Sequence, residues 1–321
     1  MKKIGLLLGL CVAFAAHAQT APAAGSGDSD SPQGTLSTRL TFPIERVQTP
    51  TYADLYCAGF ISKQLQPNTN LVVGGLQTPS TTKFVSGDLV YLTGDGYQLG
   101  QQYTVLRELK DPNRYELFSG QHAMLKETGQ PYAELGRVRV IDARSKTAIA
   151  QVEFSCDGMN PGDFAVPFAE KQSISFHPPL RFDRFVPANG KVSGRIVMSR
   201  DFDYELGTGM KVYMNVGSNQ GIKTGDYFRA VRAYTADLKD PVDSLSFKAS
   251  AAEDTQTKPP SVEASMFTKT KGPMIHVADF PRRAVGEIVI ISTTPTTSTG
   301  MIIFAMEDVR AGDRVELDDQ Q

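Results

Sequence analysis

The sequence has no tryptophan, four histidines and three cysteines in 321 residues. Its histidines do not form an H-E-x-x-H motif, and no Cys/His cluster has the spacing of a zinc site. A G-x-S-x-G nucleophile elbow is also absent. These absences argue against the common metal centres and serine nucleophiles. We expect the three histidines beyond the N-terminal run to lie on the surface or in loops: His122, His177 and His276.

Charge of either sign is not in excess, since 33 Lys and Arg residues face 35 Asp and Glu residues and the formal net charge is −2. The chain also lacks a basic cluster interleaved with aromatic residues, the usual footprint of nucleic-acid binding. We therefore expect neither a nucleic-acid partner nor a strong attraction to anionic lipid.

Long apolar runs are limited to one, at residues 4–16. It follows Lys2 and Lys3 and ends in Ala16-His17-Ala18, with small residues at the two positions that a signal peptidase reads. No later stretch approaches the length of a membrane span. Residues 1–18 are thus predicted to be a signal peptide, and the mature chain to be exported without a transmembrane segment. An uncleaved N-terminal tether is the lesser alternative.

Two cysteines, Cys57 and Cys156, lie beyond the predicted signal peptide. An even number in an oxidising compartment favours a disulfide, and two buried free thiols are the alternative. Leu55, Cys57 and Ile61 share a face of an expected strand, so the bridge would join an N-terminal strand to the last hairpin of the first domain. Closing a loop of about 100 residues contributes about 4–5 kcal/mol by chain entropy.

One segment of the chain occurs twice. VYLTGDGYQLGQQYTVLR begins at Val90, and VYMNVGSNQGIKTGDYFRAVR begins at Val212. Alignment on the closing arginines, Arg107 and Arg232, pairs two glycines in each turn. Glycine supplies the positive φ that a sharp connection between strands needs. The expected turn glycines are Gly96 and Gly100 in the first copy, and Gly221 and Gly225 in the second.

A second pair of similar segments begins at Gly136 in the first copy and at Gly286 in the second. Each segment contains a Gly-Asp pair at the same distance downstream of its first glycine. Aspartate favours tight turns because its side chain can bond nearby backbone. We interpret the four residues as structural, with a metal or acid pair as the alternative: Gly162 and Asp163, Gly312 and Asp313.

Apolar positions of period two, frequent glycine turns and the lack of a long amphipathic helix predict an all-β protein with two small barrel or sandwich domains. In this phase Phe154 and Cys156, and likewise Phe304 and Met306, are expected to face the cores. The predicted organisation is a disordered leader at 19–38, a first β domain with N-terminal strands at 39–168, a linker at 169–189, and a second β domain at 190–318 with a long mobile loop around 237–280.

Two near matches to catalytic motifs do not predict enzymes. GSNQGIKTG at 217–225 differs from a Walker loop at Ile222, its sister turn lacks the lysine and threonine, and a strand rather than a helix follows. Residues 80–83 and 223–225 match two boxes of penicillin-recognising enzymes, but the third is missing and Pro79 precludes the required helix. We expect no nucleotide and no cofactor. Tyr97 is expected to be exposed in a turn, but one aromatic residue does not make a platform that could bind a sugar.

The repeated pattern resembles the C-terminal domain of the flagellar assembly protein T family. Its residues here are Val212-Tyr213, Gly217, Gly221, Gly225-Asp226, Phe228 and Arg232, then Gly312-Asp313. The resemblance covers most of residues 70–318 and extends to exported bacterial proteins built from two such copies. It implies a small SH3-like β domain for each copy, as part of the envelope, and no catalytic residue.

From these observations we expect an exported, non-enzymatic cell-envelope binding or scaffolding protein. It would act through loops and strand edges, with an envelope protein or a cell-wall component as its partner. One alternative is a peptidoglycan- or polysaccharide-binding protein. A second alternative is an envelope hydrolase that uses Asp163 and Asp313.

Overall fold

The structure is a computed structural model that describes residues 47–78, 80–110, 115–174, 176, 182–185, 187–234 and 281–318. The chain divides into two compact units, Met1–Ile44 and Glu45–Gln321, and the described residues belong to the second. The predicted signal peptide, the leader at 19–38 and the loop around 237–280 lie outside the described residues.

The described chain begins with a short helix, α1 (Tyr52–Tyr56), followed by strand β1 (Phe60–Ser62). Thr51 caps the helix: its hydroxyl accepts from the Asp54 N–H at 3.3 Å, and the Asp54 carboxylate accepts from the Thr51 N–H at 2.8 Å. Such a reciprocal capping box fixes a helix start. The predicted strand through Leu55 and Cys57 is therefore wrong, and only Ile61 lies in a strand.

The first β-sheet has seven strands in the order β2-β3-β6-β5-β4-β7, with β1 paired to the start of β5. Its two ends meet, because Leu71 and Phe164 form a bridge and the Ala165 N–H donates to Asn70 O at 2.7 Å. A helix, α2 (Gln121–Thr128), lies between β4 and β5 in the chain. The strands are β2 (Val72–Gly75), β3 (Leu89–Thr93), β4 (Gln102–Glu108), β5 (Gln130–Ala143), β6 (Thr147–Ser155) and β7 (Phe164–Pro167).

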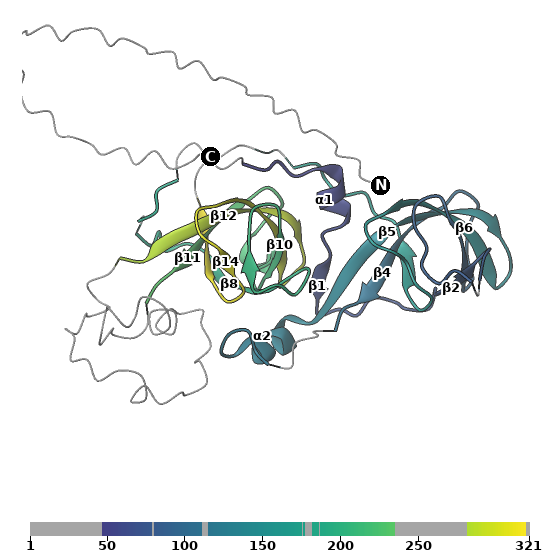
Figure 1. The fold of residues 1–321 in the computed structure, drawn as a ribbon, viewed down its shortest axis with the longest axis horizontal. Helices are drawn as coiled ribbons and strands as arrows, with labels where there is room; N and C mark the ends of the chain where they lie inside the picture. The colour runs from purple at the N-terminus through teal and green to yellow at the C-terminus, as the bar shows by residue number, and fades with distance from the viewer. Residues whose placement is uncertain are drawn as a thin grey trace, which may run out of the picture. The chain divides into compact units, whose positions relative to one another are not determined.

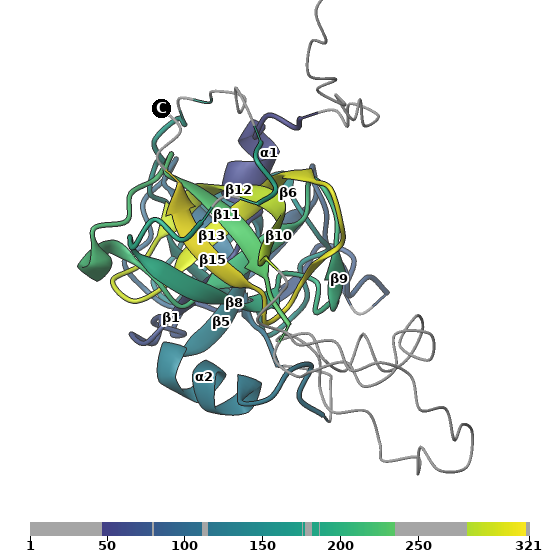
Figure 2. The same cartoon turned by 90° about the vertical axis from the view of Figure 1, so that its left-hand side faces the viewer.

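The second β-sheet is a closed barrel of six strands, in the order β10-β13-β12-β11-β15-β8 (Figures 1 and 2). A separate two-stranded ribbon pairs β9 with β14, and a 3₁₀ turn, η1 (Ser218–Gln220), lies between β10 and β11. The predicted all-β class is confirmed. The strands are β8 (Ser193–Ser199), β9 (Glu205–Leu206), β10 (Lys211–Met214), β11 (Tyr227–Arg232), β12 (Arg283–Thr293), β13 (Ser298–Ala305), β14 (Val309–Arg310) and β15 (Arg314–Asp318).

Corresponding strands of the two sheets follow each other in the same order. Because the barrel is closed, its order can be written from β8 as β8-β10-β13-β12-β11-β15, and this matches β2-β3-β6-β5-β4-β7 strand for strand. Individual backbone hydrogen bonds recur as well. The Gly100 N–H donates to Val140 O and the Gly225 N–H to Ile290 O, both at 2.8 Å. Positions in one sheet can therefore be compared residue by residue with positions in the other.

A β-bulge in β6 changes which side chains reach the first core. Val138 pairs with Val152, but its neighbour Arg137 pairs with Phe154, so Glu153 is the extra residue. An extra residue reverses the alternation of the strand. Val152 consequently lies in the core, whereas Phe154 shares the outer face with Arg137. The prediction that Phe154 faces the core is wrong.

The same bulge occurs in the barrel, where Ile288 pairs with Ile302 and Glu287 pairs with Phe304. Ile302 lies in the barrel core, and Phe304 packs with a different cluster on the outside. The expected core position of Phe304 is thus also wrong, for the same reason. Cys156 and Met306 follow directly after their strands and are only partly buried.

Candidate functional site

The six predicted turn glycines all have positive φ, between 75° and 99°. In the GSNQGIKTG segment, Ile222 is 2% exposed and lies in the barrel core, and the Lys223 N–H donates to the Asp226 carboxylate at 2.7 Å. This segment connects β10 to β11, and no helix begins at its lysine. The glycines are Gly96, Gly100, Gly162, Gly221, Gly225 and Gly312.

The two repeated aspartates are held by the two aligned arginines. Arg107 donates from Nε and Nη2 to Asp163 at 2.7 and 2.8 Å, and Arg232 does the same to Asp313 at 2.9 and 2.8 Å. Each carboxylate also accepts a backbone N–H from three residues upstream, at 2.6 and 2.7 Å. Bidentate pairing of this kind fixes both partners. In the described residues no group of three or more His, Cys, Asp or Glu side chains could hold a metal.

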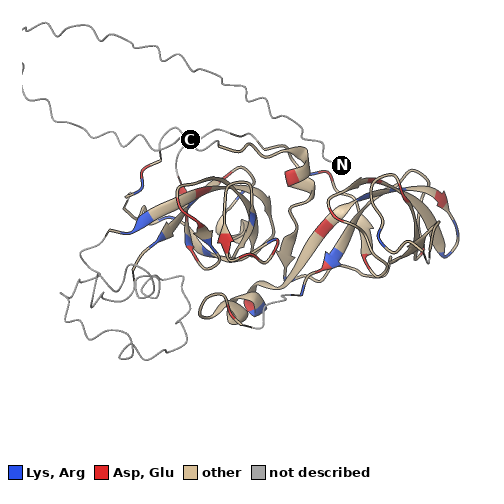
Figure 3. Ribbon diagram, in the orientation of Figure 1, with Lys and Arg blue, Asp and Glu red and all other residues tan. Residues whose placement is uncertain are grey.

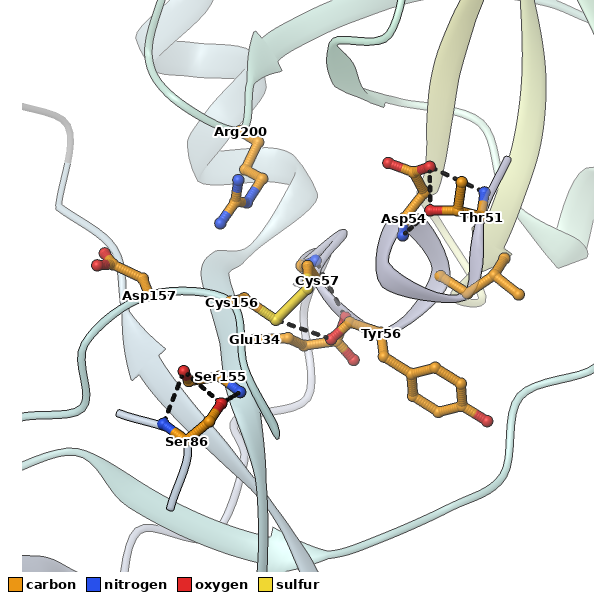
Figure 4. Close-up of a disulfide and its surroundings, with 12 residues drawn as sticks. Thr51, Asp54, Tyr56, Cys57, Ser86, Glu134, Ser155, Cys156, Asp157 and Arg200 are labelled. Carbon is orange, nitrogen blue, oxygen red and sulfur yellow. Dashed lines mark hydrogen bonds between the residues drawn. A yellow bond between two sulfur atoms is a disulfide. The ribbon is translucent and has the colours of Figure 1, made fainter. Parts of the chain in front are cut away.

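The predicted disulfide is present between Cys57 and Cys156, with a Cα–Cα distance of 5.6 Å (Figure 4). Cys57 is the C-cap residue of α1, and Cys156 directly follows β6. The bond therefore fastens the helix to the end of the strand that carries Phe154.

Tyr97 is not the exposed aromatic that its turn position suggests. It is 8% exposed, its hydroxyl donates to Thr93 O at 2.8 Å, and its ring meets Tyr103 edge to face at 5.3 Å. Burial raises the pKa of Tyr97 to about 12. His122 is exposed at the start of α2, as expected, whereas His177 and His276 lie outside the described residues.

An aromatic pocket lies on the outer face of the first sheet. Tyr56 stacks on Phe168 at 5.6 Å between ring centroids, and Tyr52 meets Phe154 edge to face at 6.1 Å. The Arg137 guanidinium lies over Phe168 at 4.9 Å and donates to the Tyr52 hydroxyl at 3.0 Å. Tyr52 is 53% exposed. We call these five residues, with Thr104 and Gly136 that also line the pocket, the aromatic site.

Charged and polar side chains border the aromatic site. Glu153, the bulged residue of β6, pairs with Arg137 at 2.9 Å and also with Arg139, and it accepts from Gln102 Nε2 at 2.7 Å. Burial is the largest single effect on the Glu153 carboxyl and acts to raise its pKa. The hydrogen bonds from Arg139 and Gln102, together with the charges of Arg139 and Arg137, outweigh burial, so the pKa of Glu153 is lowered. The guanidinium beside the rings is thus held in place by a fixed carboxylate. Across the described chain, basic and acidic residues are interspersed along the ribbon (Figure 3).

The barrel has a matching row of side chains in the equivalent position. Cross-strand pairing aligns Phe154, Arg137 and Thr104 across β6, β5 and β4. The same pairing aligns Phe304, Glu287 and Arg229 across β13, β12 and β11. Phenylalanine is common to both rows, while the central arginine of the first sheet is replaced by glutamate in the barrel.

In the barrel this row is covered by the linker. The Phe182 ring meets Phe304 edge to face at 5.1 Å and lies 5.8 Å from the Arg229 guanidinium. Arg184 forms an ion pair with Glu307, and its carbonyl accepts from the Ala284 N–H at 2.7 Å. As a result Arg229 is 7% exposed. On the first sheet Tyr52 of α1 takes the place of Phe182, since its ring meets Phe154 edge to face.

Glu287 lies beneath this cover and is 1% exposed. Its Oε2 atom has no hydrogen-bond partner among the described residues. Burial, and then the charge of Asp318, raise the pKa of Glu287 to about 7, although Arg229 acts in the opposite direction. Arg229 itself donates to Asp318 at 2.6 Å.

The aromatic site is not predicted by the sequence. Its rings come from three separated segments, and period-two reading assigned Phe154 to the core. The available signal was the alignment of Phe154 with Phe304, in which the residues beside them, Arg137 and Glu287, are not alike. A position that keeps its aromatic ring but changes the neighbouring charge points to a surface rather than a core.

No model of a known protein family matches the sequence, and no curated protein is significantly similar to it. Among the described helices, none has the length and apolar character needed to cross a membrane.

Proposed function

We propose that the chain is an exported, non-enzymatic cell-envelope binding or scaffolding protein made of two copies of one SH3-like β unit. The matching strand order and recurring hydrogen bonds support a duplicated unit. A disulfide is typical of oxidising compartments, and the N-terminal run has the pattern of an export signal. The flagellar assembly protein T resemblance suggests a place in the envelope.

The observation that carries this proposal is the aromatic site, where the half-exposed Tyr52 of α1 lies against Phe154 and beside the Arg137 guanidinium. Tyrosine and arginine are the residue types enriched where proteins bind one another. A ring that is 53% exposed beside a guanidinium held by Glu153 offers a binding surface whose side chains are already ordered. Ordered side chains lose less entropy on association.

Binding through a strand edge is less favoured in the barrel than binding through a face or loop. The six barrel strands close on themselves, so each is paired on both sides. Edge addition needs unpaired backbone groups. The outer face and the loops therefore remain as the binding elements of the described barrel.

The proposal is tested by crosslinking in cells. A photoreactive amino acid replaces Tyr52 in one variant and Tyr115 in a control, since Tyr115 is also exposed, at 80%, but does not line the aromatic site. Fractionation then reports the compartment of the crosslinked product. We expect a specific envelope-protein product from position 52 alone. Cytoplasmic protein in both variants, or identical products from both positions, contradicts the proposal.

A polysaccharide ligand is the second candidate, because aromatic rings bordered by Gln102, Glu153 and Arg139 also suit a sugar. Co-sedimentation with purified sacculi separates the two. Retention that depends on Tyr52 would favour the polysaccharide. The hydrolase alternative gains no support from Asp163 and Asp313, since an arginine already holds each carboxylate.

A further inference from the structure

A polar cavity of about 150 Å³ lies between helix α2 and the turns of the barrel, apart from the aromatic site. A cavity needs about 10–15 Å³ of such volume to hold one water, so this one has room for roughly ten non-hydrogen atoms. The side chains that give it its chemistry are Lys63, which follows β1, Met124 and Glu127 of α2, and Asn215, Gln220 and Thr296 of the barrel turns.

One wall of the cavity is a turn in which the two copies differ. From Val212 to Gly221 the chain advances nine positions, whereas from Val90 to Gly96 it advances six. The longer turn contains η1, and Gln220 of η1 lines the cavity. Loops that vary on a common scaffold are the usual carriers of binding function. The start of the GSNQGIKTG segment therefore has a role that the repeated fold does not require.

Two amide side chains of the barrel turns are held in fixed orientations. The Asn215 Oδ1 atom accepts from the Arg195 N–H at 2.7 Å, and the Gln220 Oε1 atom accepts from the Gly217 N–H at 2.9 Å. A primary amide has one oxygen acceptor and an NH₂ group with two donors. Because backbone N–H groups hold the oxygens, the NH₂ groups of both side chains are left to a ligand.

The two charged side chains of the cavity are exposed, and neither has an ion-pair partner among the described residues. Lys63 offers an ammonium group and Glu127 a carboxylate. The helix that carries Glu127 is fixed against the barrel, since Gln121 Nε2 donates to Val197 O at 3.0 Å and Met124 packs beside the same strand. The cavity thus combines one charge of each sign with two oriented amide donors.

We propose that this cavity binds a small zwitterionic peptide of about dipeptide size. Its carboxylate accepts from Lys63 and from the NH₂ groups of Asn215 and Gln220, because a carboxylate can take several donors at once. Its ammonium group pairs with Glu127, and a small apolar side chain of the peptide lies against Met124. This ligand site goes beyond the proposed function and shares no residue with the aromatic site.

A sugar suits the cavity less well than a peptide. Sugar rings bind against the faces of aromatic side chains, and none of the residues that line the cavity is aromatic. An uncharged ligand would also leave Lys63 and Glu127 without use, whereas a zwitterion engages both.

The test is a calorimetric titration of the full mature protein with alanyl-alanine, which contains about as many non-hydrogen atoms as the cavity can hold. We expect Lys63→Met to weaken binding about tenfold, since a charge-assisted hydrogen bond is lost. Gln220→Glu keeps the oxygen that accepts from the Gly217 N–H but replaces the donor by a negative charge, and it should abolish binding. Lys126→Met is the matched control, because Lys126 is an exposed lysine of α2 that does not line the cavity.

Two blocked ligands assign the charges. N-acetyl-alanyl-alanine has no ammonium group, so it should bind the wild type weakly and should bind Glu127→Gln no worse than the free dipeptide does. Alanyl-alanine amide has no carboxylate and should lose the dependence on Lys63. An unchanged melting temperature shows that each variant is folded. The inference is overturned if millimolar alanyl-alanine does not bind the wild type, if Gln220→Glu binds as the wild type does, or if blocking either end of the dipeptide has no effect.

Discussion

Arg107 and Arg232 make the same contacts to their aspartates but differ in exposure. The Arg107 side chain is 29% exposed, and that of Arg232 is 1% exposed against an Asp313 that is fully buried. A buried ion pair adds little over an apolar pair, but removal of one partner is costly because the other charge stays buried with less compensation. The two pairs therefore have the same geometry and different sensitivity to mutation.

We predict that Asp313→Ala destabilises the protein by about 3–5 kcal/mol and Asp163→Ala by about half as much, because water can reach Arg107. Urea unfolding followed by circular dichroism measures both losses. The two substitutions are matched controls for each other, since each deletes a bidentate arginine pair and one backbone hydrogen bond to the carboxylate. Equal losses would show that exposure of the arginine does not decide the cost.

Glu287 gives the barrel a pH-dependent stability. Its folded pKa of about 7 lies above the ordinary value of 4.5, so the folded state binds the proton more tightly than the unfolded state. The contribution is complete below pH 4.5 and is lost as the pH rises through about 7, a total of about 3 kcal/mol. Glu287→Gln removes this dependence.

The measurement is the difference in unfolding free energy between wild type and Glu287→Gln from pH 4 to pH 8. We expect the wild type to lose stability relative to the variant as the pH rises, with no further change above pH 8. Glu205→Gln, at an exposed position of β9, serves as the control and should follow the wild type. A constant difference across this range would contradict the raised pKa.

At the scale of elements, the sequence predicted the strands and turns well, but it did not predict which side chains of β6 and β13 face the core. Glycine turns and repeated Gly-Asp pairs depend on local backbone geometry, which single residues reveal. The bulges at Glu153 and in β13 depend on pairing between strands, so the alternation that assigns Phe154 and Phe304 to a core cannot detect them. For the same reason the aromatic site could not be assembled from sequence.

Helix α1 also escaped prediction, because five residues are far too few to be helical alone. Its Thr51–Asp54 capping box and the disulfide at its C-cap stabilise a helix that is too short to be stable alone. The disulfide closes a sequence separation of 99 residues, which corresponds to about 4–5 kcal/mol of chain entropy.

Reduction of the disulfide should therefore release α1 before either sheet unfolds. We predict new protease cleavage within residues 51–59, a loss of about 4 kcal/mol in unfolding free energy, and an intact mass higher by two hydrogens. The double variant Cys57→Ser/Cys156→Ser should behave like the reduced protein in the first two respects. Two thiols that react with an alkylating agent without reductant would contradict the prediction.

At the scale of the whole described molecule, the segment after α1 connects the two sheets. β1 pairs with β5 of the first sheet, while its neighbouring carbonyls accept hydrogen bonds from the barrel. Tyr213 donates to Ala58 O at 2.9 Å, Thr299 to Gly59 O at 2.9 Å, and Thr297 to Ile61 O at 2.6 Å. A Cβ at Gly59 would lie 2.4 Å from the Tyr213 hydroxyl, so this close approach requires glycine.

The coupling of the two sheets should depend on these hydroxyls. Thr297 and Thr299 are 1% and 2% exposed, so valine at both positions leaves two buried carbonyls without donors, at a cost of about 1–3 kcal/mol each. We predict one thermal transition by calorimetry for the wild type and two separated transitions for Thr297→Val/Thr299→Val. Thr297→Ser/Thr299→Ser keeps both donors and should retain the single transition. If the valine variant still unfolds in one step, other contacts couple the sheets, and Gln121 on α2, which donates to Val197 O at 3.0 Å, is the next residue to replace.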